Sequence, residues 1–490
     1  PSTAFSVEDP AGNAATTAGG TDRTVVYDST APQLTLQQAA TQADPTKVAT
    51  IRFTLGSDEP IDTATVSADD FTVVNGSTPT VSCTTTSCTV TTVASADGAV
   101  SIDVAPAFGV ADIAGNVADS ARVLGDATVV YDRVVTYDST APTVTLTTAA
   151  GQVSPTNDST IAFTFASNET LAGTTVTAAD FAATNGTVAS VTGSGALYTI
   201  TVTVDGQGVV SLAPSTTFAV ADPSGNETTI AGGTDRSVTY DSIAPTATLA
   251  QTADQADPAN QSEIRFAFTT SEDIVASTLT AADFAVENGG TPVITGSGAD
   301  FIVAVEASGE GAVRIGLSPT FAVADPAGNA QTSAGGTDRS VVYDVTAPTV
   351  SLVQASGQAD PAKGDSIAFT FSSNEDLRSA SVTAADFEAT NGAIDSVTGS
   401  GDTYTVTVTA TSDGDVALAP SGDFSVLDIA GNAQTSAGGA DRSVVYDSTS
   451  ATVTLTQATG QADPAKDATI RFTLSSDEAL QSGSVTTADF

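Results

Sequence analysis

The phrase Asp138-Ser-Thr-Ala-Pro-Thr-Val-Thr-Leu146 decides the organisation of this chain, because it recurs along the sequence almost unchanged. Its other copies begin at Asp28, Asp241, Asp344 and Asp447, so successive copies lie 110, 103, 103 and 103 residues apart. A fixed period of this length predicts tandem domains. A Tyr that ends an apolar run precedes each copy, so we expect the phrase to join the last strand of one domain to the first strand of the next.

The period matches a common domain size, and it predicts four complete repeats between two partial ones. The expected boundaries are 1–27 for the end of a repeat, 28–137, 138–240, 241–343 and 344–446 for complete repeats, and 447–490 for the start of a repeat. The partial ends are typical of a window taken from a longer array. An end domain completed by a neighbouring chain would give the same pattern.

The composition is strongly acidic and argues against several kinds of partner. The 490 residues include 57 acidic and 14 basic side chains and no His, which gives a formal charge of −43. Nucleic acid and anionic membranes repel such a surface. No apolar run of roughly 18 residues occurs, so we expect no membrane insertion by this segment. An apolar content of 40% is enough to build hydrophobic cores.

The repeat that starts at Asp138 has the pattern of a β-sandwich. Polar and apolar residues alternate in 143–146, 160–165 and 197–204, as in half-buried strands, and Asn185-Gly186 indicates a tight turn. About seven short strands follow from this pattern, with one possible helical turn near 177–181. The sequence therefore predicts an all-β chain of tandem antiparallel sandwiches of immunoglobulin type. Trp is absent, so Phe, Val, Ile and Leu must fill the cores.

The two cysteines, Cys83 and Cys88, have four residues between them and are flanked by alternating Thr and Val. This spacing favours a hairpin whose facing strands bring the two sulfurs together in a local disulfide. A pair of free thiols is the alternative. A zinc site is disfavoured because zinc needs about four ligands and the chain has no His and no further Cys. A disulfide would indicate an oxidising, extracellular setting.

The first complete repeat carries seven extra residues between Asn116 and Asp138. There Val129-Val130-Tyr131-Asp132 precedes a second, similar run that ends at Tyr137-Asp138. The pattern indicates a duplicated last strand. It leaves open whether Asp132 or Asp138 occupies the place of the joint aspartate.

Four motifs in a constant order resemble those of a known class of repeat. They are the Asp-x-x-Ala-Pro joint, the Ser-Asn-Glu after the second strand, the Ala-Asp-Phe followed by Asn-Gly, and the Asp-x-x-Gly-Asn before the last strand. Together they resemble the bacterial immunoglobulin-like repeats of large surface adhesins and biofilm-associated proteins. The resemblance covers essentially the whole chain. It implies an elongated rod of sandwiches that bind calcium at their junctions.

The direction of the strands predicts where the acidic residues gather. Successive strands of such a sandwich alternate in direction, so the joint, the loop after the second strand and the loop after the sixth strand should share one end of each domain. Each of these three places holds an acid. The predicted sets are Asp28, Glu59 and Asp112; Asp138, Glu169 and Asp222; Asp241, Glu272 and Asp325; Asp344, Glu375 and Asp428; and the incomplete set Asp447 and Glu478.

Three neighbouring carboxylates repel one another unless a proton or a cation intervenes. Calcium suits them better than magnesium, because flexible loops offer the 6 to 8 oxygen ligands that calcium takes. The alternative is that these acids only cap turns. Pro142, Pro245 and Pro348 would stiffen the joints by fixing φ, whereas Ala451 replaces proline in the last copy.

Other recurring polar residues have a simpler interpretation. The aspartates of Asp-Phe (Asp70, Asp180, Asp283, Asp386) are expected to cap turns, and the Phe after each is expected in the core. The aspartates before proline (Asp44, Asp257, Asp360, Asp463) fall at the far end of their domains, from which they could reach the next junction, and Ser154 replaces one of them. Arg23, Arg236 and Arg339 are expected to pair with a surface acid.

These patterns predict a structural role rather than catalysis. We expect a stalk or filament segment of an extracellular bacterial surface protein, whose partners are its own neighbouring repeats and possible further copies in a filament. The alternative is a set of immunoglobulin-like modules that bind glycans or proteins directly. An enzyme is disfavoured, because paired carboxylates repeated with every domain would duplicate one active site along the chain.

Overall fold

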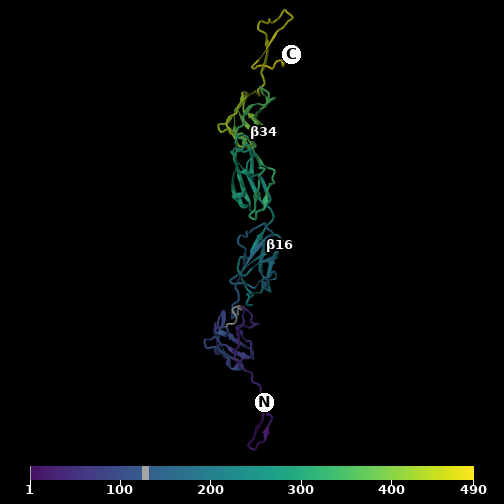
Figure 1. Ribbon diagram of the computed structural model, residues 1–490. Helices are drawn as coiled ribbons and strands as arrows, with labels where there is room; N and C mark the ends of the chain where they lie inside the picture. Colours follow the sequence, from purple (N-terminus) through teal and green to yellow (C-terminus); the bar gives the residue numbers. More distant parts are fainter. Residues whose placement is uncertain (1, 124–131) are drawn as a thin grey trace. The chain divides into compact units, whose positions relative to one another are not determined.

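The computed structural model describes residues 2–123 and 132–490. Strands and short 3-10 helices make up its regular structure (Figure 1). None of the helices in the described residues has the length and apolar character needed to cross a membrane. The chain divides into two compact units, Pro1–Ser242 and Ile243–Phe490, each of which is described by itself.

The second repeat shows the architecture of a complete domain (Figure 1, around the label β16). One sheet has the order β15-β16-β13-β12-β20, and its strands are Gly186–Ser194, Leu197–Val204, Thr160–Ser167, Val144–Thr148 and Ala231–Gly232. The other sheet has the order β14-β17-β21, with strands Phe181–Thr184, Gly208–Pro214 and Ser237–Tyr240. All neighbours in both sheets are antiparallel except β12 and β20, which are parallel.

The other complete repeats have the same two sheets. In the first repeat they are β3 (Leu34–Gln38), β4 (Thr50–Ser57), β7 (Ser87–Val93) and β6 (Thr80–Cys83), facing β5 (Phe71–Val74), β8 (Gly98–Val104) and β11 (Val134–Tyr137). In the third they are β22 (Ala247–Gln251), β23 (Glu263–Thr270), β26 (Asp300–Glu306) and β25 (Val293–Ser297), facing β24 (Phe284–Glu287), β27 (Gly311–Leu317) and β30 (Ser340–Tyr343). In the fourth they are β31 (Val350–Gln354), β32 (Ser366–Leu377) and β34 (Gly392–Ala410), facing β33 (Phe387–Thr390), β35 (Gly414–Pro420) and β38 (Ser443–Tyr446). The predicted antiparallel sandwiches are thus confirmed.

A short hairpin occupies part of the segment that the sequence indicates as a loop before the last strand. Its strands are β9 (Gly109–Ala111) and β10 (Val117–Asp119), β18 (Val220–Ala221) and β19 (Glu227–Thr228), β28 (Val323–Ala324) and β29 (Ala330–Gln331), and β36 (Val426–Leu427) and β37 (Ala433–Gln434). The partial ends contain β1 (Val7–Glu8) with β2 (Ala14–Ala15), and β39 (Val453–Gln457) with β40 (Phe472–Ser476). Two-residue strands carry too little alternation to be recognised in a sequence.

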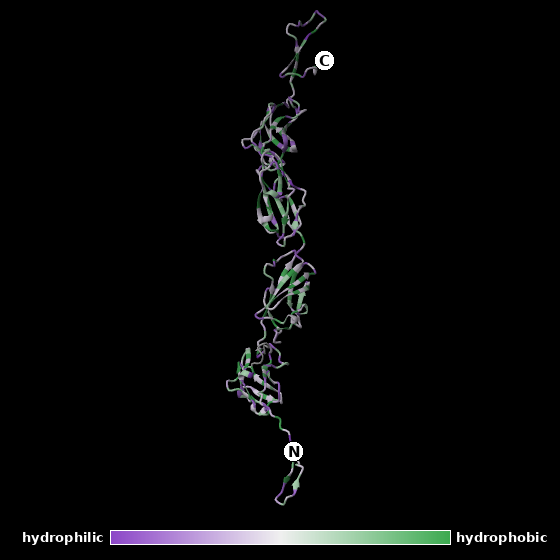
Figure 2. Ribbon diagram, viewed as in Figure 1, coloured by the Kyte–Doolittle hydropathy of each residue, from purple (hydrophilic) through white to green (hydrophobic). Residues whose placement is uncertain are grey.

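The core of each repeat follows from the two-residue period of its strands. In β13, Ile161, Phe163 and Phe165 are fully buried, while the residues between them are only partly buried or exposed. Phe165 lies opposite Tyr198 of β16, and Phe163 lies opposite Ile200. Hydrophobic residues accordingly lie along the strands of each sandwich (Figure 2). Four separate clusters of buried side chains result, one in each complete repeat.

Short 3-10 helices precede the third strand of each complete repeat. Their bounds are η1 (Thr63–Thr65), η2 (Ala68–Asp70), η4 (Gly173–Thr175), η5 (Ala178–Asp180), η6 (Ala276–Thr278), η7 (Ala281–Asp283), η8 (Ser379–Ser381) and η9 (Ala384–Asp386); η3 (Ser120–Arg122) and η10 (Thr487–Asp489) lie elsewhere. In η5, the buried carboxylate of Asp180 accepts hydrogen bonds from the backbone N–H and the hydroxyl of Thr177. The next residue, Phe181, is in the core. The capping role and the core position predicted for this motif are confirmed.

The hairpin between β6 and β7 holds the two cysteines. Cys83 lies opposite Cys88, and the two form a disulfide. Cys88 is fully buried in the core of the first repeat. It stands at the position of Tyr198 in the second repeat, where Gly193 takes the place of Cys83. Glycine is required at position 193 in this backbone conformation, because a Cβ would clash with the carbonyl oxygen of Leu197.

The last strand of the first repeat settles the position of the joint aspartate. β11 ends at Tyr137, and the backbone N–H of Asp138 donates to the carbonyl oxygen of Thr46. Asp241 makes the same bond to Thr156 after the second repeat. Asp138 is therefore the joint aspartate. The duplicated run Val129-Val130-Tyr131 lies outside the described residues.

Candidate metal centre

Three acids of each complete repeat come from three different segments. In the second repeat, Asp138 lies in the joint before β12, Glu169 follows β13, and Asp222 follows β18. The segments that follow β13 and β18 lie side by side, because the backbone N–H of Ala172 donates to the carbonyl oxygen of Ala221. This is the placement that the sequence predicts from strand direction.

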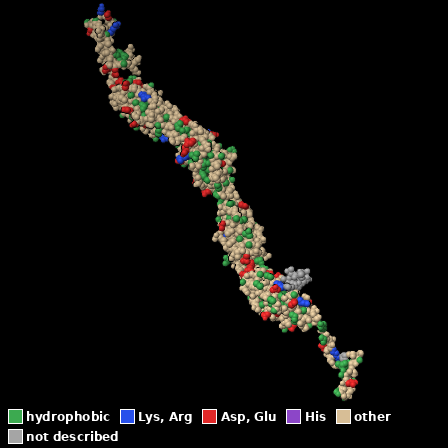
Figure 3. Space-filling view, turned by 60° about the vertical axis from the view of Figure 1, so that its left-hand side comes forward, with side chains coloured by type: hydrophobic (Ala, Val, Ile, Leu, Met, Phe, Trp, Pro, Cys, Tyr) green, Lys and Arg blue, Asp and Glu red, His purple; other side chains and the backbone are tan. Residues whose placement is uncertain are grey.

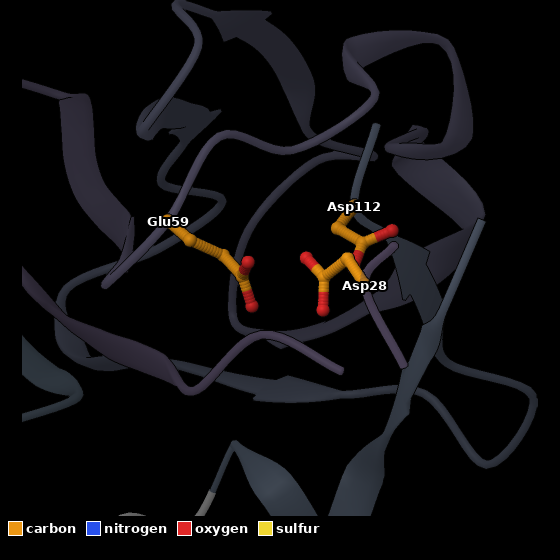
Figure 4. Close-up of side chains that lie close together, drawn as sticks. All are labelled: Asp28, Glu59 and Asp112. Carbon is orange, nitrogen blue, oxygen red and sulfur yellow. The ribbon is translucent and has the colours of Figure 1, made fainter. Parts of the chain in front are cut away.

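The carboxylates of these acids lie close together. In each set, one oxygen of every carboxylate lies within 4.8 Å of the others; the sets that fall within a single unit are Asp28, Glu59 and Asp112; Asp138, Glu169 and Asp222; and Asp344, Glu375 and Asp428. Figure 4 shows the carboxylates of the first set directed toward one another. Asp241 belongs to the first unit, whereas Glu272 and Asp325 belong to the second, so the other three sets are the undivided ones.

The third acid of each set is buried and held by a nearby asparagine. Asp222 is 2% exposed, and its two carboxylate oxygens accept hydrogen bonds from the backbone N–H and the side-chain amide of Asn226, at 2.9 and 2.8 Å. Asp112 is bound in the same way by Asn116, and Asp428 by Asn432. The turn role that the sequence offers as an alternative is therefore present.

The same asparagines also contact the joint. The side-chain amide of Asn226 donates to the carbonyl oxygen of Asp138 at 2.8 Å, and Asn432 does so to Asp344 at 2.9 Å. The joint aspartate in turn caps its own turn, because its carboxylate accepts from the backbone N–H two residues on, as in Asp138 and Thr140. These bonds fix two of the three acids before any ligand is considered.

The electrostatics of the sets show the cost of bringing these charges together. Burial, followed by the charges of Asp138 and Asp222, raises the pKa of Glu169 above its ordinary value. The pKa of Glu375 is raised in the same way. Burial tends to raise the pKa of Asp112 as well, but hydrogen bonds from Asn116 and nearby backbone amides outweigh it and lower that pKa. In these two sets, the folded structure therefore disfavours the charged form of the glutamate.

The donor chemistry of the sets fits a hard cation. All three side chains offer carboxylate oxygens, and an ionised carboxylate has about four lone-pair positions, so the hydrogen bonds from asparagine leave others free for a ligand. Oxygen donors without nitrogen or sulfur favour calcium or magnesium over zinc. The last, incomplete set shows the same electrostatic effect, since burial and the charge of Asp447 raise the pKa of Glu478.

A fourth acid near two of the undivided sets was missed by the sequence reasoning. Asp97 raises the pKa of Glu169, and Glu310 raises that of Glu375. Both acids belong to the preceding repeat, where they lie in the turn that leads into β8 and β27. The available signal was their recurrence just before a glycine, Gly98 and Gly311.

The remaining recurrent residues serve the fold. Asp44 accepts from the backbone N–H of Thr136 in the last strand, and Ser154 does the same for Thr239, which explains why serine replaces aspartate there. The guanidinium of Arg236 donates to the carbonyl oxygens of Ala231 and Gly232. The expected pairing of this arginine with a surface acid is replaced by these contacts.

Acidic side chains outnumber basic ones on the face drawn in Figure 3, where they form small groups on a largely uncharged surface. This follows from the composition, with 57 acidic and 14 basic residues. The charge of the chain is therefore not balanced locally by Lys and Arg. Counter-charge must come from the solution.

No family model matches this chain, and no curated protein matches it. Among solved structures it is similar to the Escherichia coli adhesin FdeC, with 14% identity and a TM-score of 0.32, over 62% of this chain and 97% of that one. It is similar to invasin, a bacterial integrin-binding protein, with 10% identity and a TM-score of 0.34, over 87% and 82%. The Yersinia pseudotuberculosis adhesin InvE gives 16% identity and a TM-score of 0.18, over 44% and 67%. At these values the similarities do not bear on what the chain does.

Proposed function

We propose that this chain is a structural segment of an extracellular bacterial surface protein of the adhesin type, and that calcium bound at its joints stiffens it. The role is to span distance as a rod, with the repeats themselves as its main partners. One observation carries the proposal: sets of three carboxylates recur at the joints with their oxygens within 4.8 Å of one another. If the role of the chain is to span distance, each joint needs its own stiffening site, which accounts for the repetition of the site with every domain.

Calcium is favoured by the chemistry of each set. Loops supply the acids, and the joint backbone lies beside them, so carboxylate and carbonyl oxygens can together provide the 6 to 8 ligands of calcium. An extracellular module needs an affinity of only roughly 10⁻⁴ to 10⁻³ M. Binding would offset the burial and the neighbouring charges that together raise the pKa of Glu169. It would also tie the joint to the domain that follows it.

Calorimetric titration of calcium into the chelator-treated full chain tests the metal site. We expect binding in the range above, and we expect the paired variant Glu169→Gln with Asp222→Asn to lose about one site. Asp69→Asn is the matched control, because this exposed acid belongs to none of the sets. Equal heats for all three proteins would contradict the proposal.

Small-angle scattering of the same samples tests the mechanical role. At a calcium concentration ten times the Kd, binding adds about 1.4 kcal/mol to the stability of the bound form. We therefore expect calcium to increase the maximum dimension of the wild-type chain. If chelator and millimolar calcium give the same dimension although calcium binds, the stiffening role is wrong and the metal site stands.

A further inference from the structure

The turn that connects the two sheets between the fifth and sixth strands of each complete repeat contacts the joint that follows. Asp97 lies in the turn between β7 and β8. Its carboxylate accepts the backbone N–H and the hydroxyl of Ser139, both at 2.8 Å, and the hydroxyl of Thr140 at 2.5 Å. These three hydrogen bonds hold the two joint residues that come directly after Asp138.

An asparagine directly after the third strand of the repeat holds this turn in place. Asn75 has a φ of 57°, a conformation that Asn tolerates better than most residues, and its side-chain amide donates to the carbonyl oxygen of Ala96 at 2.7 Å. Asn391 makes the equivalent bond to Ser412 in the fourth repeat. The acid therefore approaches the joint from a braced turn.

The contact recurs in the second unit. Asp413 accepts the backbone N–H and the hydroxyl of Ser448, at 2.8 and 2.7 Å, and the hydroxyl of Thr449. Glu310 accepts the backbone N–H of Val345 at 3.1 Å and the hydroxyl of Thr346 at 2.6 Å. The hydrogen bonds from Thr and the joint backbone lower the pKa of both acids. The longer glutamate thus makes the same kind of contact as the aspartates.

The joint after the second repeat differs. Gln207 stands where the other repeats have an acid; its amide oxygen accepts from the backbone N–H of Ser242 at 3.2 Å, and its amide nitrogen donates to the Ser242 hydroxyl at 2.9 Å. The next residue in the sequence is Ile243, where the other joints have Thr. The acid and the threonine hydroxyl are therefore both replaced at this joint, as expected of two positions that act together.

We propose that the side chain in this turn and the two residues after the joint aspartate form a latch, independent of metal, that orders the start of each joint. Hydrogen bonds to a charged acceptor are roughly twice as strong as neutral ones. The latches made by Asp97, Glu310 and Asp413 are consequently strong, and the one made by Gln207 is weak. The joints of this chain therefore differ in how well ordered they are before any cation binds.

Hydrogen exchange of the full chain in chelator, measured by mass spectrometry, tests the latch. We expect Asp97→Ala to speed amide exchange at Ser139 about tenfold, with β13 unchanged. Asp97→Glu should keep exchange slow, since Glu310 makes the equivalent hydrogen bonds in the third repeat. Thr140→Val removes the hydroxyl that donates to Asp97 and should also speed exchange. Asp69→Ala is the matched control. Gln207→Glu should slow exchange at Ser242.

Two results would overturn the proposal. One is unchanged exchange at Ser139 in both Asp97→Ala and Thr140→Val. The other is faster exchange in β13 to the same degree, which would mean that the variants loosen the domain rather than the joint. Because the measurement is made without calcium, failure of the calcium proposal leaves it intact, and failure of the latch leaves the calcium titration unaffected.

Discussion

The first and second repeats build the same part of the core in different ways. In the second repeat, the ring of Phe165 packs against Phe181, Tyr198 and Phe218, with centroid distances of 5.3, 6.3 and 6.0 Å. In the first repeat, Leu55 and Cys88 stand at the positions of Phe165 and Tyr198. The disulfide to Cys83 links the two strands of this hairpin covalently, whereas in the second repeat Gly193 and Tyr198 only face each other in the strand register. The comparison teaches that a covalent link and an aromatic cluster can occupy equivalent places in one fold.

The largest effect is expected from breaking the aromatic cluster. Phe165→Ala should reduce the stability of the second repeat by about 3–5 kcal/mol, because the cavity adds to the lost burial. Hydrogen exchange of β16 in the full chain measures this repeat by itself. Val209→Ala, at a 57% exposed side chain, is the control and should change little. A loss below about 1 kcal/mol would mean that the cluster does not hold this core together.

Removing the covalent link should have the next largest effect. Opening a loop this short costs about 2 kcal/mol by the chain-entropy estimate, and only the first repeat contains a disulfide in the described residues. We expect a reductant to speed exchange in β7 and to leave β16 unchanged. The variant Cys83→Gly with Cys88→Tyr, which copies the second repeat, should no longer respond. Equal responses of β7 and β16 would contradict the comparison.

Acid should act alike on both repeats, since both carry the same set of carboxylates. Folding raises the pKa of Glu59 and of Glu169, so the folded chain binds these protons more tightly than the unfolded chain. In chelator, stability should therefore rise as the pH falls from neutral through the raised pKa values. The pKa of Asp97 is lowered, so its contribution is lost at still lower pH.

Thermal unfolding in chelator at a series of pH values measures this effect. Glu169→Gln should remove the pH response of the second repeat and leave that of the first, which hydrogen exchange can separate. The outcome that would contradict the prediction is stability that falls steadily from neutral pH in the wild-type chain. That outcome would mean that burial and the neighbouring charges do not raise the pKa of these glutamates in the folded state.

The smallest effect concerns the hydroxyl of the core tyrosine. The Tyr198 hydroxyl is buried without a hydrogen-bond partner among the described residues, whereas the Tyr404 hydroxyl donates to Ser379 at 3.3 Å. Position 379 corresponds to Gly173 in the second repeat. Tyr198→Phe should therefore be neutral or stabilising by less than about 1 kcal/mol, and Tyr404→Phe should cost about 1 kcal/mol. Gly173→Ser should make the second repeat behave like the fourth.

Much of the fold could be predicted from the sequence, because polar and apolar residues alternate along the strands. The strands around Phe163 and Tyr198, the turn at Asn185 and the cap at Asp180 all follow from local patterns. The gathering of Asp138, Glu169 and Asp222 followed from one further rule, the alternation of strand direction. These features depend on short-range chemistry repeated in every domain.

Other features depend on contacts that no local pattern shows. The bond of Asp97 to Ser139 joins residues 42 positions apart, and neither residue is unusual in its own segment. The parallel pairing of β20 with β12 involves two residues, Ala231 and Gly232, with no alternation to recognise. Comparison of the repeats with one another would have revealed the acids in the turns before β8, β27 and β35.

One core residue, which lies opposite Leu55 in the first repeat and opposite Phe165 in the second, has a consequence for how the repeats fold as the chain is synthesised. It is Cys88, Tyr198, Phe301 and Tyr404 in the four complete repeats, so no two adjacent repeats share it. Newly made tandem domains misassemble when neighbours exchange strands. Between the first two repeats, a borrowed strand would exchange Cys88 for Tyr198, which would put a side chain of the wrong size into the core and separate the disulfide partners. We therefore expect this difference to favour correct assembly of the first two repeats as they emerge one after another from the ribosome.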